Sequence, residues 1–437
     1  MPRDLVAVPL TFVGAGEETD VAAYGYSSDG GHLVIQLGSF DSGVSTSDRE
    51  AYARQVEEIT RLRIVDVADG SDKLNFQQSS PEQQQPMTVA DVQQGLRSVG
   101  FFPGGRADGI CGYRTLSAMR LFQEYVRSVE KRPSLPDGHF GSASQQHLRR
   151  WIDDHRVTDW APTIERWRGG TLGQTEYTEW ISLLERVREQ YIASPNRTLQ
   201  LINAFAGITD TRRVAQWDFS TSGNVHLVGI RRGEVSGKFD DVFVLLIKGL
   251  VFKFQGSTEP GASDNAQGVP FLVQGQHDYH FGWHKKQYLA LRPQHLDRGV
   301  LVVRSKGDMR LDDADLNNGL EANASINIHW GGKGMKYDVK NWSEGCQVIN
   351  GSVYINAQNE LIDCSAFAAT NNGEVASNPS KTRGAYNVLL DLVTALSSDL
   401  SGNSVKYTLL TEQDLELGPT LKEGLAEARA QVGRLLG

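Results

Sequence analysis

Cysteine is scarce in this chain: Cys111, Cys346 and Cys364 are the only three among 437 residues. So few cysteines cannot form the disulfide framework of a small secreted domain, although one pair could still bond. No two of them are spaced as Cys-x-x-Cys, so a structural zinc site is not expected. Each thiol is therefore considered alone, as a core residue or as a nucleophile, and Cys364 is expected to be a packed thiol.

Long hydrophobic runs and basic runs are also missing. No segment reaches eighteen apolar residues, so we expect no transmembrane helix. The net charge of −9 and the lack of a basic run argue against a nucleic-acid partner. The apolar stretch Leu5–Val13 is interrupted by Pro9 and Thr11, which makes it a poor signal peptide. We therefore expect synthesis in the cytoplasm without a Sec-type signal.

The composition is that of an ordinary globular chain, with 39% hydrophobic and 22% charged residues. The length favours about three domains, and the polar segment Gln77–Pro86 is the clearest linker. We expect a multidomain α+β protein in five parts. These are an α/β accessory domain of unknown role (1–76), the linker (77–86), a small three-helix domain (87–152), a helical connector (153–222) and a β-rich domain with decorating helices (223–437).

Hydrophobic periodicity predicts the individual elements. The expected helices are Ser47–Leu62, a helix opened by Thr88 or Asp91 and ending at Val99, Thr178–Ile192, Arg197–Phe205, Ala385–Leu396 and Glu412–Leu435. The expected strands are Val6–Val13, His32–Leu37, His226–Ile230, Val242–Ile247, Leu250–Phe254, Pro270–Val273, Gln287–Leu291 and Leu301–Arg304. Trp160, Trp167 and Trp180 could form a sugar platform, but helical spacing favours packing.

One stretch carries the chemistry of an acyl transfer. Ile326–Ile349 holds His329, a glycine-rich loop, and then Ser343-Glu344-Gly345-Cys346 at the start of a strand. A thiol titrates near pH ~8.5, so a neighbouring imidazole is needed to take its proton. A cysteine at a strand mouth, preceded by glycine, leaves backbone N–H groups free to hold an oxyanion. The pattern therefore favours a cysteine nucleophile over a buried core thiol.

This stretch resembles the YkuD-type L,D-transpeptidase signature, which is a histidine, a gap, Ser or Thr, usually His, and then Gly-Cys. The resemblance implies that Cys346 is the nucleophile, that His329 is its base and that Ser343 and Gly345 shape the oxyanion site. It further implies a cysteine enzyme that needs no cofactor and acts on peptidoglycan. The chain departs from the signature at Glu344 (usually His), Trp330 (usually small) and Val348 (often Arg).

Further substrate-binding residues are expected around the signature. Related sequences carry a His-Lys-x-x-Tyr strand, which makes His284 and Tyr288 neighbours of the active site. The residues that flank the two catalytic positions complete the expected substrate site: Trp330, Trp342, Glu344 and Gln347. The departures place the chain nearer to effector or phage-associated members of the family than to housekeeping enzymes.

A second resemblance covers residues 87–152. Gly-Phe-Phe-Pro-Gly is followed by two copies of Asp-Gly-x-x-Gly, at Asp108–Gly112 and Asp137–Gly141. Each copy precedes a helix start, as a turn that leads into an N-terminus. The segment is similar to a PG_binding_1-type peptidoglycan-binding domain, which implies a groove near Phe101, Phe102, Arg106 and Tyr113. Phe101 could equally be a core residue.

Three interpretations of function follow. The first is a cysteine transpeptidase or carboxypeptidase, delivered as an antibacterial effector by a secretion apparatus, with an immunity protein as partner, or released with a phage. The second is a zinc peptidase built on His277, His280 and His284, although these residues do not form an HExxH motif. The third is a non-catalytic component of a phage or secretion apparatus that binds cell wall through residues 87–152.

Overall fold

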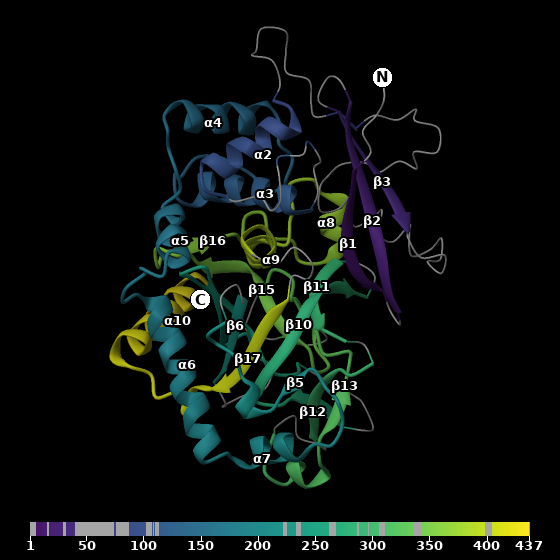
Figure 1. Ribbon diagram of the computed structural model, residues 1–437, viewed down its shortest axis with the longest axis vertical. Coiled ribbons are helices and arrows are strands. Elements are labelled where there is room, and N and C mark those ends of the chain that lie inside the picture. The colour runs from purple at the N-terminus through teal and green to yellow at the C-terminus, as the bar shows by residue number, and fades with distance from the viewer. Residues whose placement is uncertain are drawn as a thin grey trace.

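The computed structural model describes the backbone of four N-terminal strands and most of the chain after residue 86 (Figure 1). The described residues are 6–14, 17–28, 32–39, 74–75, 87–101, 107, 109, 113–221, 225–232, 237–261, 268–285, 288–295, 297–305, 311–334, 339, 342–397 and 404–436. The expected helix Ser47–Leu62 and Cys111 lie outside them. Among the described helices, none combines the length and the hydrophobicity that a membrane span requires.

The N-terminal strands form an antiparallel sheet in the order β1-β2-β3-β4. Their bounds are β1 (Val6–Gly14), β2 (Glu17–Ser28), β3 (His32–Ser39) and β4 (Leu74–Asn75). The strands expected over Val6–Val13 and His32–Leu37 are therefore confirmed.

The described residues also contain a ten-stranded sheet, in which the pairing of β10 with β11 closes a barrel-like ring. Its order is β11-β14-β15-β8-β7-β6-β17-β10-β5, with β16 paired to β15. The bounds are β5 (Thr211–Arg212), β6 (Val225–Arg231), β7 (Asp241–Ile247), β8 (Leu250–Ser257), β10 (Gly275–His284), β11 (Tyr288–Pro293), β14 (Ile328–Trp330), β15 (Gln347–Ile355), β16 (Leu361–Asp363) and β17 (Val405–Thr411). Strands β6 and β7 are buried along their whole length, which explains their nearly continuous apolar sequences.

Four helices share a single hydrophobic core with this sheet; one of them packs directly on the strands and the other three lie beyond it (Figure 1). They are α2 (Val89–Ser98), α3 (Tyr113–Ser128), α4 (Ser142–Asp153) and α9 (Ala385–Leu396). Arg120 of α3 forms a buried ion pair with Asp391 of α9, with Arg120 Nε 2.8 Å from Asp391 Oδ2. The Tyr354 hydroxyl of β15 donates to Glu124 of α3 at 2.7 Å. The three helices of residues 87–152 are therefore packed into the main body.

Helices α5 and α8 add to this first core, whereas α6, α7 and α10 form a second core with the main sheet and with a three-stranded sheet of order β13-β12-β9. The elements are α5 (Trp160–Arg168), α6 (Glu176–Ala193), α7 (Arg197–Ala204), α8 (Asn372–Ser377), α10 (Pro419–Leu436), β9 (Val269–Leu272), β12 (Val300–Ser305) and β13 (Glu321–Asn323), with 3-10 turns at Val214–Gln216, Asp315–Asn318 and Glu412–Asp414. Trp160 and Trp180 are buried, which confirms the packing role expected for them. Trp160 joins α5 to Phe252 of β8.

The expected single helix Glu412–Leu435 is wrong at its start. The chain makes a short 3-10 turn at Glu412–Asp414, capped by Thr411, and α10 begins only at Pro419. Proline is favoured in the first turn of a helix, because its missing N–H would have no partner there. The whole is a mixed α+β protein with a barrel-like sheet and several helices.

Candidate functional site

The candidate site is built on two neighbouring parallel strands, β14 and β15. Their register pairs Ile328 with Gln347 and His329 with Val348. The N–H of Gln347 also donates to the carbonyl of Asn327 at 2.8 Å. Cys346 immediately precedes β15 and therefore lies beside Asn327, two residues before His329 on the neighbouring strand. Pairing of the two strands brings together residues that are seventeen positions apart in the sequence.

The turn before Cys346 is fixed by Ser343 and Gly345. The Ser343 hydroxyl donates to the carbonyl of Cys346 at 2.6 Å and accepts from the N–H of Gly345 at 3.1 Å. Gly345 has a φ of 143°, and a Cβ there would lie 2.8 Å from Pro270. Only glycine fits this backbone. The Gly345 N–H is thus occupied, which leaves the Cys346 N–H as the candidate donor for an oxyanion.

The ring of His329 is buried and held in one tautomer. Its Nδ1 lies 2.8 Å from the carbonyl of Trp330, which requires Nδ1 to donate. The Tyr288 hydroxyl lies 3.2 Å from both this carbonyl and Nδ1. Nε2 is buried and makes no hydrogen bond of acceptable geometry within the described part of the chain, although the backbone of Trp342 lies close enough to the ring to raise its pKa. A neutral ring protonated on Nδ1 leaves Nε2 as a base.

His284 and Asn327 support the ring of His329. The His284 ring stacks on it, with ring centroids 4.1 Å apart, and its Nδ1 lies 3.1 Å from the side-chain nitrogen of Asn327. Burial lowers the pKa of His329 to about 4, and burial together with the nearby His329 lowers that of His284 to about 2. Both rings are therefore neutral near pH 7.

The thiol of Cys346 lies between two backbone groups of the segment that leads into β14. Sγ donates to the carbonyl of Ser325 and accepts from the N–H of Asn327, both at 3.4 Å. Burial raises the pKa of the thiol, against smaller opposing effects of the Asn327 N–H and of Lys285. Among the described residues, Cys346 and His329 form no hydrogen bond with each other. The resting site thus holds a neutral thiol and a neutral imidazole.

Known proteins do not identify the site. Comparison with protein-family models, with curated proteins and with solved structures finds no match. The chemistry of the site is therefore inferred from its own residues and their contacts.

Arg292 is a further member of this site that the sequence motifs did not indicate. Arg292 of β11 pairs with His280 of β10, so both side chains project from the same face as Gly282 and His284. A Cβ on Gly282 would lie 2.8 Å from Arg292 Cδ, so the arginine stem crosses β10 over that glycine. The Arg292 guanidinium partly opposes the rise that burial causes in the pKa of Cys346. In the sequence, the alternation of His280, Gly282 and His284 indicates one face of a strand with space above the glycine, which is the feature that could have predicted a long side chain crossing there.

The expected substrate residues have different positions. Glu344 is exposed beside the nucleophile, and Trp342 is half-buried with its ring 5.5 Å from that of Trp330. Trp330 is fully buried, and Gln347 accepts from the Tyr407 hydroxyl at 3.0 Å in the core. Glu344 and Trp342 can therefore face a substrate, whereas Trp330 and Gln347 support the strands beneath it.

The three histidines considered as zinc ligands do not converge. His277 is buried away from the site, where Nδ1 lies 2.9 Å from the Thr211 hydroxyl and Nε2 lies 3.0 Å from the Val273 carbonyl. His284 stacks on His329 instead. In the described part of the chain, no group of three or more His, Cys, Asp or Glu side chains is arranged to hold a metal ion.

The residues expected to form a peptidoglycan groove are only partly described. Phe101 is fully buried against Phe122, Tyr125, Trp151 and Trp160, so its ring packs the core and does not face a ligand. Phe102 and Arg106 lie outside the described residues. Tyr113 is the first residue of α3.

Proposed function

We propose that this chain is a cysteine acyltransferase that acts on the peptide stems of peptidoglycan, with Cys346 as nucleophile and His329 as base. The observation that carries the proposal is the His329 ring. Its Nδ1 is committed to the Trp330 carbonyl, and its unpartnered Nε2 lies on the strand next to Cys346. The choice of peptidoglycan rests on the resemblance of the His329–Cys346 stretch and of residues 87–152 to wall-directed families.

The reaction has two steps. His329 Nε2 takes the thiol proton, and the sulfur attacks the carbonyl carbon of the amide that follows diaminopimelate in a tetrapeptide stem. The C–N bond breaks, His329 returns the proton to the leaving amine, and D-alanine departs from a Cys346 thioester. An amine acceptor then gives a cross-link or an exchanged amino acid, and water gives carboxypeptidase activity.

The resting site must rearrange before the first step. The thiol hydrogen-bonds to Ser325, so Cys346 has to rotate its side chain before its proton can reach His329. Catalytic hydrogen bonds are often made only once substrate is bound. Because both groups are neutral at rest, the proton transfer accompanies attack, and no standing thiolate is required.

Mass spectrometry of muropeptides incubated with the purified protein tests the proposal. We expect loss of D-alanine from tetrapeptide stems by wild type, and no conversion by Cys346→Ala, because no acyl-enzyme can form. Cys364→Ala is the matched control, because the Cys364 side chain is fully buried in the core and cannot reach a substrate. Conversion by Cys346→Ala would end the cysteine mechanism. Loss of activity in a strong chelator would favour the zinc peptidase instead.

The proposed biological role is a wall-directed toxin, with a phage-derived enzyme as the alternative. Fusion to an export signal should cause rounding or lysis when the chain is expressed in a Gram-negative host, while cytoplasmic expression is tolerated. Harmless periplasmic expression of a protein that is active when purified would contradict the toxin role.

Residues 87–152 are proposed to hold the enzyme on the wall. Their helices share the main core, so deleting them would strip apolar cover from α9 and would not test binding. Substitution of Phe102 and Arg106 by alanine should instead reduce cosedimentation with sacculi. It should leave turnover of soluble muropeptides unchanged, because tethering acts through effective concentration alone. Equal losses in both assays would place these residues in the active site.

A further inference from the structure

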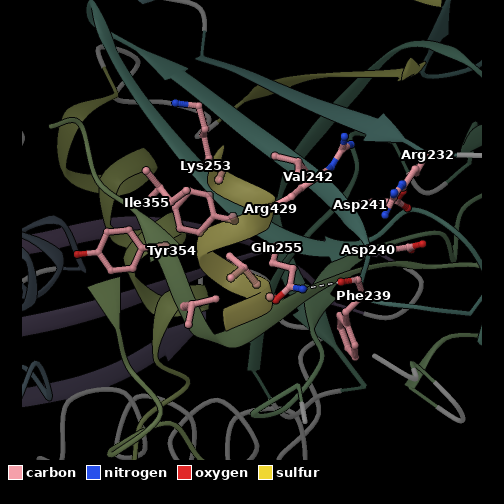
Figure 2. A pocket seen from close by; sticks show the side chains of 15 residues that line it. Arg232, Phe239, Asp240, Asp241, Val242, Lys253, Gln255, Tyr354, Ile355 and Arg429 are labelled. Atoms are coloured by element: carbon pink, nitrogen blue, oxygen red, sulfur yellow. Dashed lines mark hydrogen bonds between the residues drawn. The ribbon is translucent and has the colours of Figure 1, made fainter. Parts of the chain in front are cut away.

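A cavity of about 160 Å³ lies between helix α10 and the strands β7, β8 and β15 (Figure 2). A cavity of about 150 Å³ is large enough to hold benzene. Its walls are mostly apolar, and they are formed by Val242, Phe254, Val353, Ile355, Ala428 and Val432. Figure 2 shows Arg232, Asp240 and Asp241 at one end of this space and Tyr354 and Ile355 at the other.

Arg429 of α10 lines the cavity with an incompletely paired guanidinium. Nη1 donates to Glu412 at 2.9 Å. Nε and Nη2 are buried and have no hydrogen-bond partner among the residues that the structure describes. These two nitrogens form one edge of the planar guanidinium, the edge that holds both oxygens of a carboxylate in a bidentate pair. Neighbouring side chains cover both nitrogens, so the guanidinium has to turn toward the cavity before a ligand can pair with it. Leaving such donors buried and unpaired is costly, so a ligand that pairs them gains this energy on binding.

The other charged groups of the wall have partners in the fold or reach solvent. Lys253 pairs with Glu176 at 2.7 Å, and the Asp241 carboxylate accepts from both the N–H and the hydroxyl of Thr258. Arg232 is exposed at the open end and adds a second positive charge. The carboxyl of Asp240 also lies there, within electrostatic reach of Arg429. A ligand carboxylate on Arg429 would therefore meet the positive charges of Arg429 and Arg232 and the negative charge of Asp240, with its apolar part against the inner walls.

We propose that this cavity binds a small carboxylate of about four carbons, held by the Nε and Nη2 of Arg429. The site is separate from Cys346, and the proposal does not depend on the acyl transfer. Phe239 is the link between the two regions. Its ring lines the cavity and packs on Val348, the residue paired with His329.

Isobutyrate and its neutral isostere isobutyramide are the probes, and calorimetry or saturation-transfer NMR on the full chain is the measurement. We expect isobutyrate to bind with a Kd on the order of millimolar, as suits a ligand of this size. The amide should bind at least roughly tenfold more weakly, because it cannot form the charged bidentate pair.

Variants on α10 separate this site from general surface binding. Arg429→Gln should weaken isobutyrate binding by roughly tenfold or more, and Arg429→Lys should do so nearly as much, since a lysine keeps the charge but not the planar edge. Arg434→Gln is the matched control, because Arg434 is exposed on the same helix, and it should bind as wild type does. The wild-type comparison of the two probes stands even if a variant fails to fold. Equal binding of acid and amide, no binding of either, or equal loss in Arg429→Gln and Arg434→Gln would overturn the proposal.

Discussion

The imidazole rings of His284 and His329 stack with their centroids 4.1 Å apart and their planes inclined by 22°. His284 belongs to β10 and His329 to β14, and β11 lies between these strands in the sheet. The stack and the contact of His284 with Asn327 hold His329 from one side, while Tyr288 and the Trp330 carbonyl hold it from the other. His284 is therefore a positioning residue for the proposed base.

Removing this support should impair His329 in two measurable ways. We expect His284→Ala to lower kcat/KM on muropeptides by roughly tenfold or more, because a base displaced by about 1 Å transfers protons poorly. Water that enters beside the ring should also raise the pKa of His329 from about 4 toward its ordinary value. The acid limb of the pH–rate profile would then move to higher pH. His155→Ala, at an exposed position, is the control. An unchanged rate and an unchanged acid limb in His284→Ala would show that His284 does not position His329.

Buried neutral histidines should make stability depend on pH, and His277 offers the clearest test. Burial lowers its pKa to about 4, below the value near 6.5 of the unfolded chain. Between these values the unfolded state binds more protons. The stability contributed by this group is therefore full above about pH 6.5 and is lost as the pH falls toward 4.

The difference between wild type and a variant isolates this effect. Asp241 and Glu259, whose pKa values burial raises to about 6 and about 7, act in the opposite direction, so the total slope is a sum. The free energy of unfolding of wild type should fall more steeply from pH 6.5 to 5 than that of His277→Gln, by up to about 1.4 kcal/mol per pH unit. Urea unfolding at several pH values measures both slopes, and parallel slopes would show that His277 is not buried in its neutral form.

The buried pair Arg120–Asp391 should be costly to break and easy to replace. Asp391→Asn leaves a buried guanidinium without its counter-charge, and we expect it to reduce the free energy of unfolding by about 3–5 kcal/mol. Replacing both partners by apolar residues (Arg120→Met with Asp391→Leu) should restore most of that loss. Glu165→Ala breaks the exposed pair with Arg168 and should cost less than about 1 kcal/mol. If Asp391→Asn unfolds like wild type, α3 and α9 are not joined as described.

The fold could be predicted where local chemistry decides it. The helix expected to open at Thr88 or Asp91 has Thr88 as its N-cap, with Asp91 completing a capping box. The apolar run at Val242–Ile247 matches the buried strand β7. The packing of α3 on α9 could not be predicted, because it joins residues 271 positions apart through Arg120 and Asp391. The polar segment Gln77–Pro86 suggested that residues 87–152 form a separate module. In the structure, the helices of these residues share a hydrophobic core with the main sheet.

The candidate site was predictable only in part, for a similar reason. His329 and Cys346 stand close in the sequence and in a recognisable frame. Arg292 and Gly282 enter the site through the pairing of β10 with β11, and the cavity at Arg429 needs α10 to lie opposite β7, β8 and β15. Such contacts depend on register and on tertiary packing, which hydrophobic periodicity does not specify.

The acyl-enzyme itself gives the most direct test of the central claim. Purified protein is mixed with a disaccharide tetrapeptide, quenched in acid within seconds, and examined by intact-protein and peptide mass spectrometry. We expect an adduct on Cys346 equal in mass to the substrate minus D-alanine, release of free D-alanine at the same rate, and no adduct in Cys346→Ala. An adduct at another residue, or turnover of the tetrapeptide by Cys346→Ala, would contradict it.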